Sequence, residues 1–173
     1  MEMHGTRQIA APREVVWAAL NSPEVLKSAI PGCQELTGGP DEGFEATVKQ
    51  KVGPVSATFN GAVRLTDVVP LTSYTITGEG KGGAAGFAKG SAAVELADSE
   101  GGTLLTYKVT ANVGGKLAQL GSRLIDGFAK KMADSFFDNF RAAIEPPAEP
   151  ATDEAAADAK QPGWFGRMMG RKA

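Results

Sequence analysis

The residue types that most often carry covalent or metal chemistry are scarce in this chain. It has a single histidine, His4, and a single cysteine, Cys33. Neither stands at a spacing that would pair a nucleophile with a base, and no Cys/His cluster has the spacing of a zinc site. We interpret His4 as an exposed residue at the start of a strand. Cys33, which follows Pro31-Gly32, is interpreted as a small half-buried residue. The sequence therefore predicts no catalytic residue and no metal ligand, so we expect a protein that is not an enzyme.

One glycine motif has the pattern of a dinucleotide-binding loop. The run Gly78-Glu79-Gly80-Lys81-Gly82-Gly83 fits GxGxxG, follows an expected strand and has Asp98 further along. In a dinucleotide-binding fold a helix must begin directly after these glycines, because the pyrophosphate lies at its N-terminus. Residues 84–96 alternate like a strand instead. We therefore interpret the motif as a hairpin and hypothesise that it gates the mouth of a cavity.

The bulk composition narrows the class of protein. The chain has 173 residues, of which 42% are hydrophobic, and a formal net charge of −2. That length allows one domain with residues to spare, and that charge does not suit a nucleic-acid groove. We find no secretory signal pattern at the start and no apolar run of about 20 residues. Together with the single cysteine, this composition predicts a cytoplasmic protein that binds no nucleic acid.

The composition changes sharply near residue 145. Residues 145–158 contain five acidic residues and three prolines but no basic residue. Such a segment buries too little apolar surface to offset the entropy of ordering it, so we expect an extended linker. Residues 160–173 then carry four basic residues, no acidic residue and one of the two tryptophans. We predict a folded domain over 1–144, a disordered linker over 145–160 and a membrane-interacting tail over 161–173.

Hydrophobic periodicity predicts the elements of the domain. We expect a strand over residues 3–10 and then two short helices, the second with Ser22 as its N-cap. Residues 33–113 alternate with period two and have short turns, which predicts antiparallel strands. We expect residues 116–144 to form one long helix, because apolar residues recur there every four positions. This order predicts an α+β helix-grip fold, in which a curved antiparallel sheet wraps around a long C-terminal helix.

The inner face of the expected sheet is rich in small side chains. Eight of the positions that should face inward are glycine or alanine: Ala46, Ala57, Gly61, Gly78, Ala88, Gly90, Ala92 and Ala111. Protein interiors are normally close-packed, and voids are costly. Such a face either lets the helix pack closely or leaves an apolar cavity beneath it. The sequence leaves both interpretations open.

Several motifs resemble one protein family in the order in which they occur. They are Ala11-Pro12-Arg13-Glu14-Val15-Val16-Trp17, Ile30-Pro31-Gly32-Cys33, Val52-Gly53-Pro54-Val55, Gly86-Phe87-Ala88-Lys89-Gly90-Ser91, Gly102-Thr103-Leu104-Leu105-Thr106-Tyr107 and Gly114-Gly115-Lys116-Leu117-Ala118-Gln119-Leu120-Gly121. Over about residues 3–144 the chain resembles CoxG, the family of the carbon monoxide dehydrogenase G subunit, within the START-like (SRPBCC) superfamily of lipid-binding cups. The resemblance implies a role with a molybdenum hydroxylase of the CO dehydrogenase type, at the inner face of the cytoplasmic membrane. It also implies a membrane-binding tail and a carried quinone, menaquinone or ubiquinone.

The predicted tail has the composition of a membrane-surface segment. If it forms a helix, its large apolar residues share one side, with arginines flanking them and glycines opposite. Such residues suit the headgroup region of an anionic leaflet and predict weak, salt-sensitive binding. The predicted membrane contacts are Trp164, Phe165, Arg167, Met168, Met169, Arg171 and Lys172. A frayed end, or a peptide that docks on a protein partner, is the alternative.

The function expected from these observations is a non-catalytic carrier of an apolar ligand. Tyr107 is the expected polar contact to a quinone carbonyl. The residues expected to line the ligand are Leu20, Ile30, Phe44, Phe59, Phe87, Tyr107, Leu120, Leu124 and Phe128. A recruitment adaptor or an assembly factor, each without ligand carriage, remains an alternative. So does a START-like enzyme, which would need a buried acid or histidine on the inner face.

Overall fold

The structure is a computed structural model that describes residues 1–145. The linker and the tail predicted after residue 145 lie outside the described residues. The strands are β1 (Glu2–Ile9), β2 (Cys33–Gly39), β3 (Gly43–Val52), β4 (Val55–Val69), β5 (Ser73–Lys81), β6 (Phe87–Ser99) and β7 (Gly102–Gly114). The helices are α1 (Arg13–Leu20), α2 (Pro23–Ala29) and α3 (Ser122–Ile144), with 3-10 turns η1 (Gly83–Ala85) and η2 (Gly115–Leu120).

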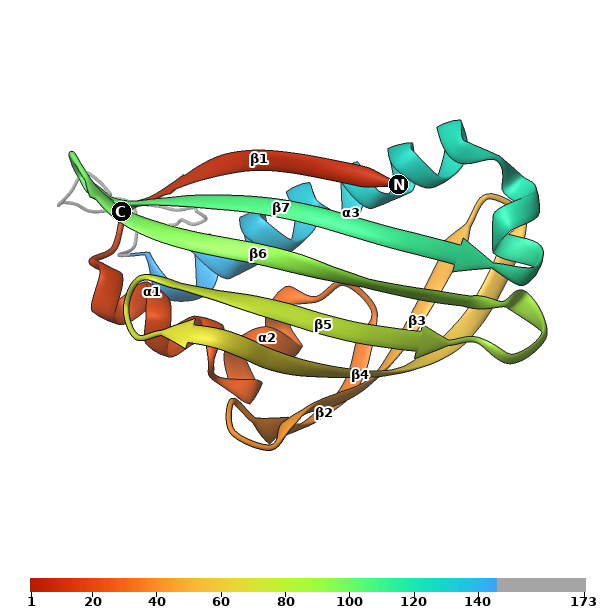
Figure 1. The fold of residues 1–173 in the computed structure, drawn as a ribbon, viewed down its shortest axis with the longest axis horizontal. Coiled ribbons are helices and arrows are strands. Elements are labelled where there is room, and N and C mark those ends of the chain that lie inside the picture. The colour runs from red at the N-terminus through yellow and green to blue at the C-terminus, as the bar shows by residue number, and fades with distance from the viewer. Residues whose placement is uncertain (146–173) are drawn as a thin grey trace, which may run out of the picture.

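The described strands form one antiparallel sheet in the order β1-β7-β6-β5-β4-β3-β2. Each neighbouring pair except β1–β7 is a hairpin, so the chain meanders across the sheet and returns with β1 beside the last strand. The sheet curves, and α3 runs along its inner side (Figure 1). The predicted α+β helix-grip fold is confirmed.

The two short helices close one end of the curved sheet. The expected cap of α2 is present, because Ser22 Oγ accepts a hydrogen bond from the Val25 N–H at 3.4 Å and Pro23 occupies the first turn. The end of α3 is held at the same place, where Glu145 Oε2 accepts a hydrogen bond from the Ala10 N–H at 2.9 Å. We call this the closed end. It also contains the β4–β5 and β6–β7 turns (Figure 1).

The opposite end, which we call the open end, carries the β3–β4 turn, η1, η2 and the first turns of α3. Here the sequence prediction of one helix over residues 116–144 is wrong. The backbone at Gly121 has φ 91° and ψ 155°, a conformation that only glycine adopts at low cost, and it separates η2 from α3. Leu120 therefore does not belong to the apolar stripe of α3.

The main core lies at the closed end. Ile9, Val16, Leu105 and Phe140 are almost completely buried there, between the sheet and the three α-helices. Phe137 is buried beside Phe140, although it falls outside the predicted four-residue series. A four-residue series winds around a 3.6-residue helix, so it is exposed at Leu124 and is buried only at Phe140, where Phe137 lies on the same side of α3.

Candidate functional site

The strand register aligns the small inward residues into two rows at the open half of the sheet. In one row Gly61 lies opposite Ala46 and Gly80, and Ala88 lies opposite Gly80 and Val113. The next row contains Val63, Gly78, Gly90 and Ala111. We call the small members of these rows the small-residue floor: Ala46, Gly61, Gly78, Gly80, Ala88, Gly90 and Ala111. Rows nearer the closed end carry large side chains instead, such as Tyr74 opposite Val94 and Val94 opposite Tyr107.

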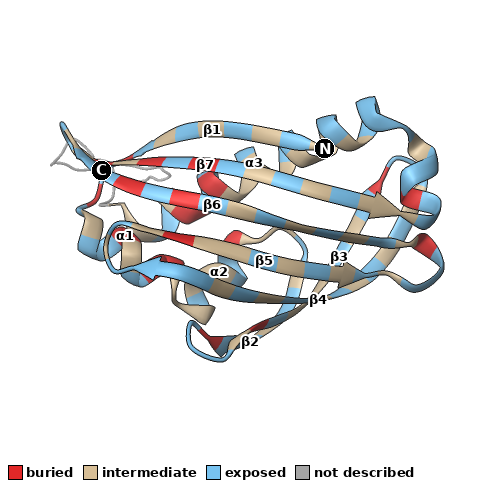
Figure 2. Cartoon of the chain, in the orientation of Figure 1, coloured by how far each residue is buried: buried red, intermediate tan, exposed pale blue. Residues whose placement is uncertain are grey.

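Burial along each inner face follows the same division. On β6, Val94 and Leu96 are buried, but Ala88, Gly90 and Ala92 are only half-buried. The inward residues of β1, β5 and β7 show the same change from buried at the closed end to half-buried at the open end (Figure 2). A helix packed closely on the floor would cover its small residues completely. Within residues 1–145, α3 therefore leaves the floor accessible to solvent.

The space above individual glycines separates two reasons for their presence. A Cβ added to Gly80 would meet no atom within 4 Å, and one added to Gly61 would come no nearer than 3.5 Å, to backbone. Those two positions border open space. A Cβ at Gly78 would instead collide with Val63 Cγ1, and one at Gly90 with the Thr110 carbonyl oxygen. Gly78 and Gly90 are thus required by neighbouring packing, whereas Gly61 and Gly80 leave room.

A pocket of about 330 Å³ lies between the end of β7, η2 and the start of α3. This volume is within the usual range for small-molecule sites. Ala111 from the floor forms part of its wall, with Val113 beside it and Ile125 facing them from α3. Its lining residues are Met1, Ala111, Asn112, Val113, Ala118, Ser122, Ile125 and Asp126. The open half of the sheet and this pocket together form what we call the hollow.

The structure divides the nine residues predicted to line a ligand into three groups. Phe59 and Phe128 are half-buried on β4 and α3, beside the open half of the sheet, and Leu120 is half-buried at the end of η2. Leu124 is 40% exposed, and it packs so closely on Gly53 of the β3–β4 turn that a Cβ there would come within 2.7 Å of it. Leu20 and Tyr107 belong to the closed-end core.

The remaining three residues are placed differently. Ile30 is half-buried where α2 ends, whereas Phe44 is buried at the start of β3, opposite Val63 in the second row. The prediction for Phe87 is wrong, because this side chain is 39% exposed on the outer face of the sheet. It alternates with the inward Ala88 and covers Gly114 of β7, where a Cβ would collide with its ring. The alternation that made Ala88 inward already required Phe87 to point outward.

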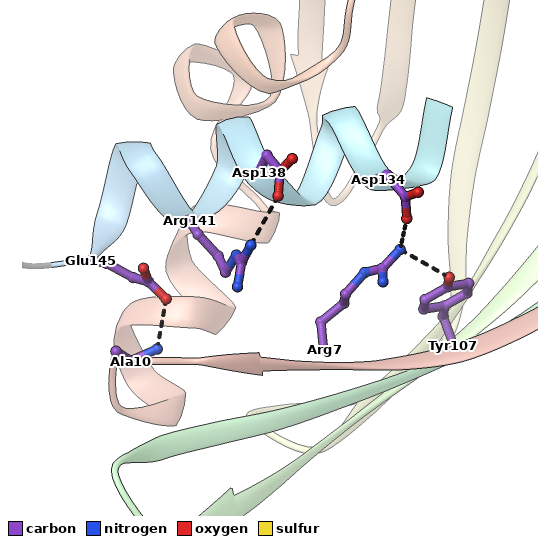
Figure 3. Close-up of polar contacts among 7 residues, drawn as sticks. All are labelled: Arg7, Ala10, Tyr107, Asp134, Asp138, Arg141 and Glu145. Atoms are coloured by element: carbon purple, nitrogen blue, oxygen red, sulfur yellow. Dashed lines mark hydrogen bonds and ion pairs between the residues drawn. The ribbon is translucent and has the colours of Figure 1, made fainter. Parts of the chain in front are cut away.

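One inward charged residue was missed by the sequence analysis. Arg7 lies half-buried on the inner face of β1, where it alternates with the exposed residues Thr6 and Gln8. Its Nη2 forms an ion pair with Asp134 Oδ1 of α3 at 2.6 Å and donates to the Tyr107 hydroxyl at 3.4 Å (Figure 3). The alternation of residues 2–9 could have shown that this residue faces inward, as it did for the other strands.

Arg7 also stacks on aromatic rings. Its guanidinium carbon lies 5.7 Å from the centre of the Tyr107 ring and 5.1 Å from that of Phe137, and these two rings stack at 5.4 Å. Arg7 Nε is buried and has no hydrogen-bond partner within residues 1–145. The Tyr107 hydroxyl therefore contacts a cation at the boundary between the closed-end core and the hollow.

Burial raises the pKa of two groups, Tyr74 and Cys33. The Tyr74 ring packs edge-on against Trp17 at 5.4 Å. At Cys33, nearby Lys27 and a contact to the Glu35 backbone oppose the rise in pKa. A raised thiol pKa makes Cys33 less nucleophilic at neutral pH. His4 is exposed on β1, as predicted.

Over residues 1–145, no three His, Cys, Asp or Glu side chains gather closely enough to hold a metal ion. None of the helices in that range is both long and apolar enough to cross a bilayer. The predicted membrane contacts from Trp164 to Lys172 lie outside the described range.

A curved antiparallel sheet that grips a long C-terminal helix, with two short helices at one end, defines a START-like helix-grip protein. The family follows from the sequence. The family model for the G subunit of carbon monoxide dehydrogenase (CoxG) matches residues 5–145, so the chain belongs to the CoxG family, as its motifs suggested. Membership implies a role associated with carbon monoxide dehydrogenase.

Solved structures share this fold. A conserved protein from Geobacillus kaustophilus is 28% identical, with a TM-score of 0.78 over 83% of this chain and 95% of its own. Protein Ms6760 from Mycobacterium smegmatis is 18% identical, with a TM-score of 0.62 over 86% and 93%. Protein CV1439 from Chromobacterium violaceum is 16% identical, with a TM-score of 0.61 over 84% and 98%. Among proteins with curated descriptions, none has a significantly similar sequence. Neither the family nor these structures indicate a catalytic activity.

Proposed function

We propose that this protein carries an apolar, lipid-like molecule, a respiratory quinone, in the hollow and serves a molybdenum hydroxylase of the CO dehydrogenase type. In this proposal residues 161–173 tether the protein to the inner face of the cytoplasmic membrane. The protein performs no chemistry itself. Family membership supports the association with the hydroxylase, and the ligand is inferred from the hollow.

The observation that carries the proposal is the half-burial of the small-residue floor. Gly61, Gly80 and Ala88 are adjacent across three strands, and a Cβ added at Gly61 or Gly80 would meet no protein atom closer than 3.5 Å. Leaving apolar surface uncovered costs stability, and such surface marks an interaction site, here one on the inner side of the sheet. A floor of glycine and alanine admits a flat ring close to the backbone, and Phe59 and Phe128 offer aromatic walls.

Tyr107 and Arg7 lie at the boundary between the closed-end core and the hollow, whereas the polar residues Asn112, Ser122 and Asp126 line its pocket. The Tyr107 oxygen accepts a hydrogen bond from Arg7, which leaves the hydroxyl proton available to donate. A quinone carbonyl would accept that proton only after a shift of the Tyr107 ring, which is buried. We therefore assign recognition mainly to shape and apolar contact, with Tyr107 in a secondary role.

The experiment is to purify the full chain from cells that make quinones, extract it with organic solvent and identify the extract, alongside native mass spectrometry. We expect a stoichiometric isoprenoid quinone. The double variant Ala88→Leu/Ala111→Leu, which fills the floor, should lose most of it. The matched variant Ala93→Leu changes an exposed residue of the outer face and should retain it.

Two results would contradict the proposal. If the wild-type protein contained no lipid but still bound the hydroxylase, it would be a recruitment adaptor or assembly factor. If the floor-filled variant kept as much quinone as the wild type, the ligand would bind elsewhere. The tether is tested separately by Trp164→Ser/Phe165→Ser, which should move the protein from the membrane fraction to the soluble fraction.

A further inference from the structure

The charged residues of the described domain are segregated between its two ends. We define the rim as residues 49–58, 79–89 and 112–127, which surround the open end (Figure 1). The rim contains six basic and two acidic residues, whereas the rest of residues 1–145 contains eight basic and fourteen acidic residues. The domain therefore has a cationic open end and an acidic remainder, although its total charge is nearly balanced. The six cations are Lys49, Lys51, Lys81, Lys89, Lys116 and Arg123.

All six rim cations are exposed, and within residues 1–145 none of them belongs to an ion pair. The three ion pairs of the described domain involve Arg7, Arg13 and Arg141, all outside the rim. The charge of the rim is thus not neutralised internally. It remains available to an anionic partner.

Exposed apolar side chains accompany these cations. Phe87 is 39% exposed on the outer face, where Lys81 lies directly opposite it and Lys89 is the next residue on the same side. Leu124 is 40% exposed and directly follows Arg123 in the first turn of α3. Aromatic or aliphatic side chains between basic ones are typical of surfaces that rest in the headgroup region of a bilayer.

We propose that the rim of the folded domain docks on an anionic membrane surface, so that the hollow opens directly onto the bilayer. The reason for such docking rests on the proposed carriage of a ligand. An apolar molecule passes from the bilayer to the hollow at little cost only if the mouth of the hollow touches the membrane. The charge and exposure of the rim residues support the docking surface independently of the ligand. It is separate from the tail, because every residue that forms it lies in the described domain.

A protein partner fits the rim less well. Five of the six rim cations are lysines, and lysine is depleted at the centres of protein–protein interfaces, where arginine is enriched. Lysine acts as a flexible point charge without a fixed hydrogen-bonding fork, which suits a diffuse anionic surface. Charge type and geometry therefore favour lipid headgroups over an acidic protein.

The tail and the rim can reach the same membrane. The described chain ends at Glu145 on the closed end, and α3 spans about 35 Å along the domain, from 23 residues at a rise of ~1.5 Å each. Residues 146–163 can extend to about 60 Å, from 18 residues at ~3.3 Å each. That reach exceeds the length of α3. A tail that leaves the closed end can therefore insert into the bilayer on which the open end rests.

The test compares the vesicle binding of two full-length variants of equal charge in a sedimentation assay. One, Lys51→Gln/Lys81→Gln/Arg123→Gln, removes three rim cations, and its control, Lys27→Gln/Lys108→Gln/Lys130→Gln, removes three exposed cations elsewhere. On vesicles of phosphatidylcholine with phosphatidylglycerol, we expect the rim variant to bind about a hundredfold more weakly than the wild type. The control should stay within about threefold, because charges beyond a Debye length of ~10 Å from the membrane contribute little.

Orientation provides a second readout. In a Cys33→Ser background, an environment-sensitive dye on Ala84→Cys labels the rim, and the same dye on Ala97→Cys labels the closed end; both positions are exposed. On anionic vesicles the emission of the rim label should shift to the blue and become protected from iodide, whereas that of the closed-end label should not change. The opposite pattern, or equal vesicle binding by the rim variant and the wild type, overturns the proposal.

Failure of this inference can be distinguished from failure of the proposed function. A quinone found in the purified protein without rim-dependent vesicle binding leaves the carrier intact and removes the docking face. Rim-dependent binding without any extractable lipid leaves the docking face and removes the carrier. If the rim variant binds vesicles normally but no longer binds the hydroxylase, the rim is a protein interface and the inference is wrong.

Discussion

Replacing Ala88 with leucine tests directly whether the floor borders empty space. In a close-packed interior such an enlargement forces strained rotamers and costs about 1–3 kcal/mol. Ala88 is half-buried, and its neighbour Gly80 has no atom within 4 Å of where a Cβ would be. The larger side chain therefore has room, and each added methylene that leaves water gains at most ~0.8 kcal/mol. We expect the free energy of unfolding to change by less than about 1 kcal/mol.

Two alanine-to-leucine controls complete this experiment. Ala29 is 0% exposed against the closed-end core, so Ala29→Leu should lower the free energy of unfolding by about 1–3 kcal/mol. Ala93→Leu, on the outer face, should change it by less than about 0.5 kcal/mol. Urea unfolding gives these values, and a Tm scan should show a loss of roughly 3 °C per kcal/mol. If Ala88→Leu destabilised the protein as much as Ala29→Leu, the space over the floor would be filled by protein and the reasoning would fail.

Three further predictions concern the described domain. Gly127→Ala should raise the free energy of unfolding by about 0.5–1 kcal/mol, because Gly127 lies inside α3 and an added Cβ meets no atom within 4 Å; an unchanged urea midpoint would contradict this. Arg7→Met should lower the free energy of unfolding by about 1–2 kcal/mol, because the guanidinium no longer stacks on Tyr107 and Phe137. Asp134→Asn should lower it by less than about 1 kcal/mol, because Asp134 is half exposed. Equal losses of stability in thermal unfolding would show that the ion pair dominates. Burial raises the pKa of Tyr74 above that of an unfolded tyrosine, so the unfolded state loses that proton first and stability falls as pH rises above about 10. Tyr74→Phe should weaken this loss of stability at alkaline pH, as measured by denaturant titrations at several pH values. An identical pH profile for the variant and the wild type would refute the assignment to Tyr74.

The sequence predicted the fold through local patterns. Alternation over residues 44–113 identified inward positions correctly, since those from Phe44 to Val113 are all buried or half-buried, and Ser22 before Pro23 marked the start of α2. The same patterns gave the wrong helix boundary where a single backbone angle determines it. A four-residue apolar repeat runs through Leu120, and only the positive φ of Gly121 ends η2 there. Helical periodicity carries no information about such a break.

For the candidate site, the sequence by itself determined that small residues occur on the inner face, because alternation assigns a face to every strand residue. Only the tertiary structure decided that Gly61, Gly80 and Ala88 lie side by side across three strands. Strand register depends on turns and cross-strand packing far apart in sequence. It also decided that Arg7 meets Asp134, separated by 127 positions, and that six scattered cations gather at one end. Faces are set by neighbours in the chain, whereas rows, ion pairs and charged ends are set by how the strands pair.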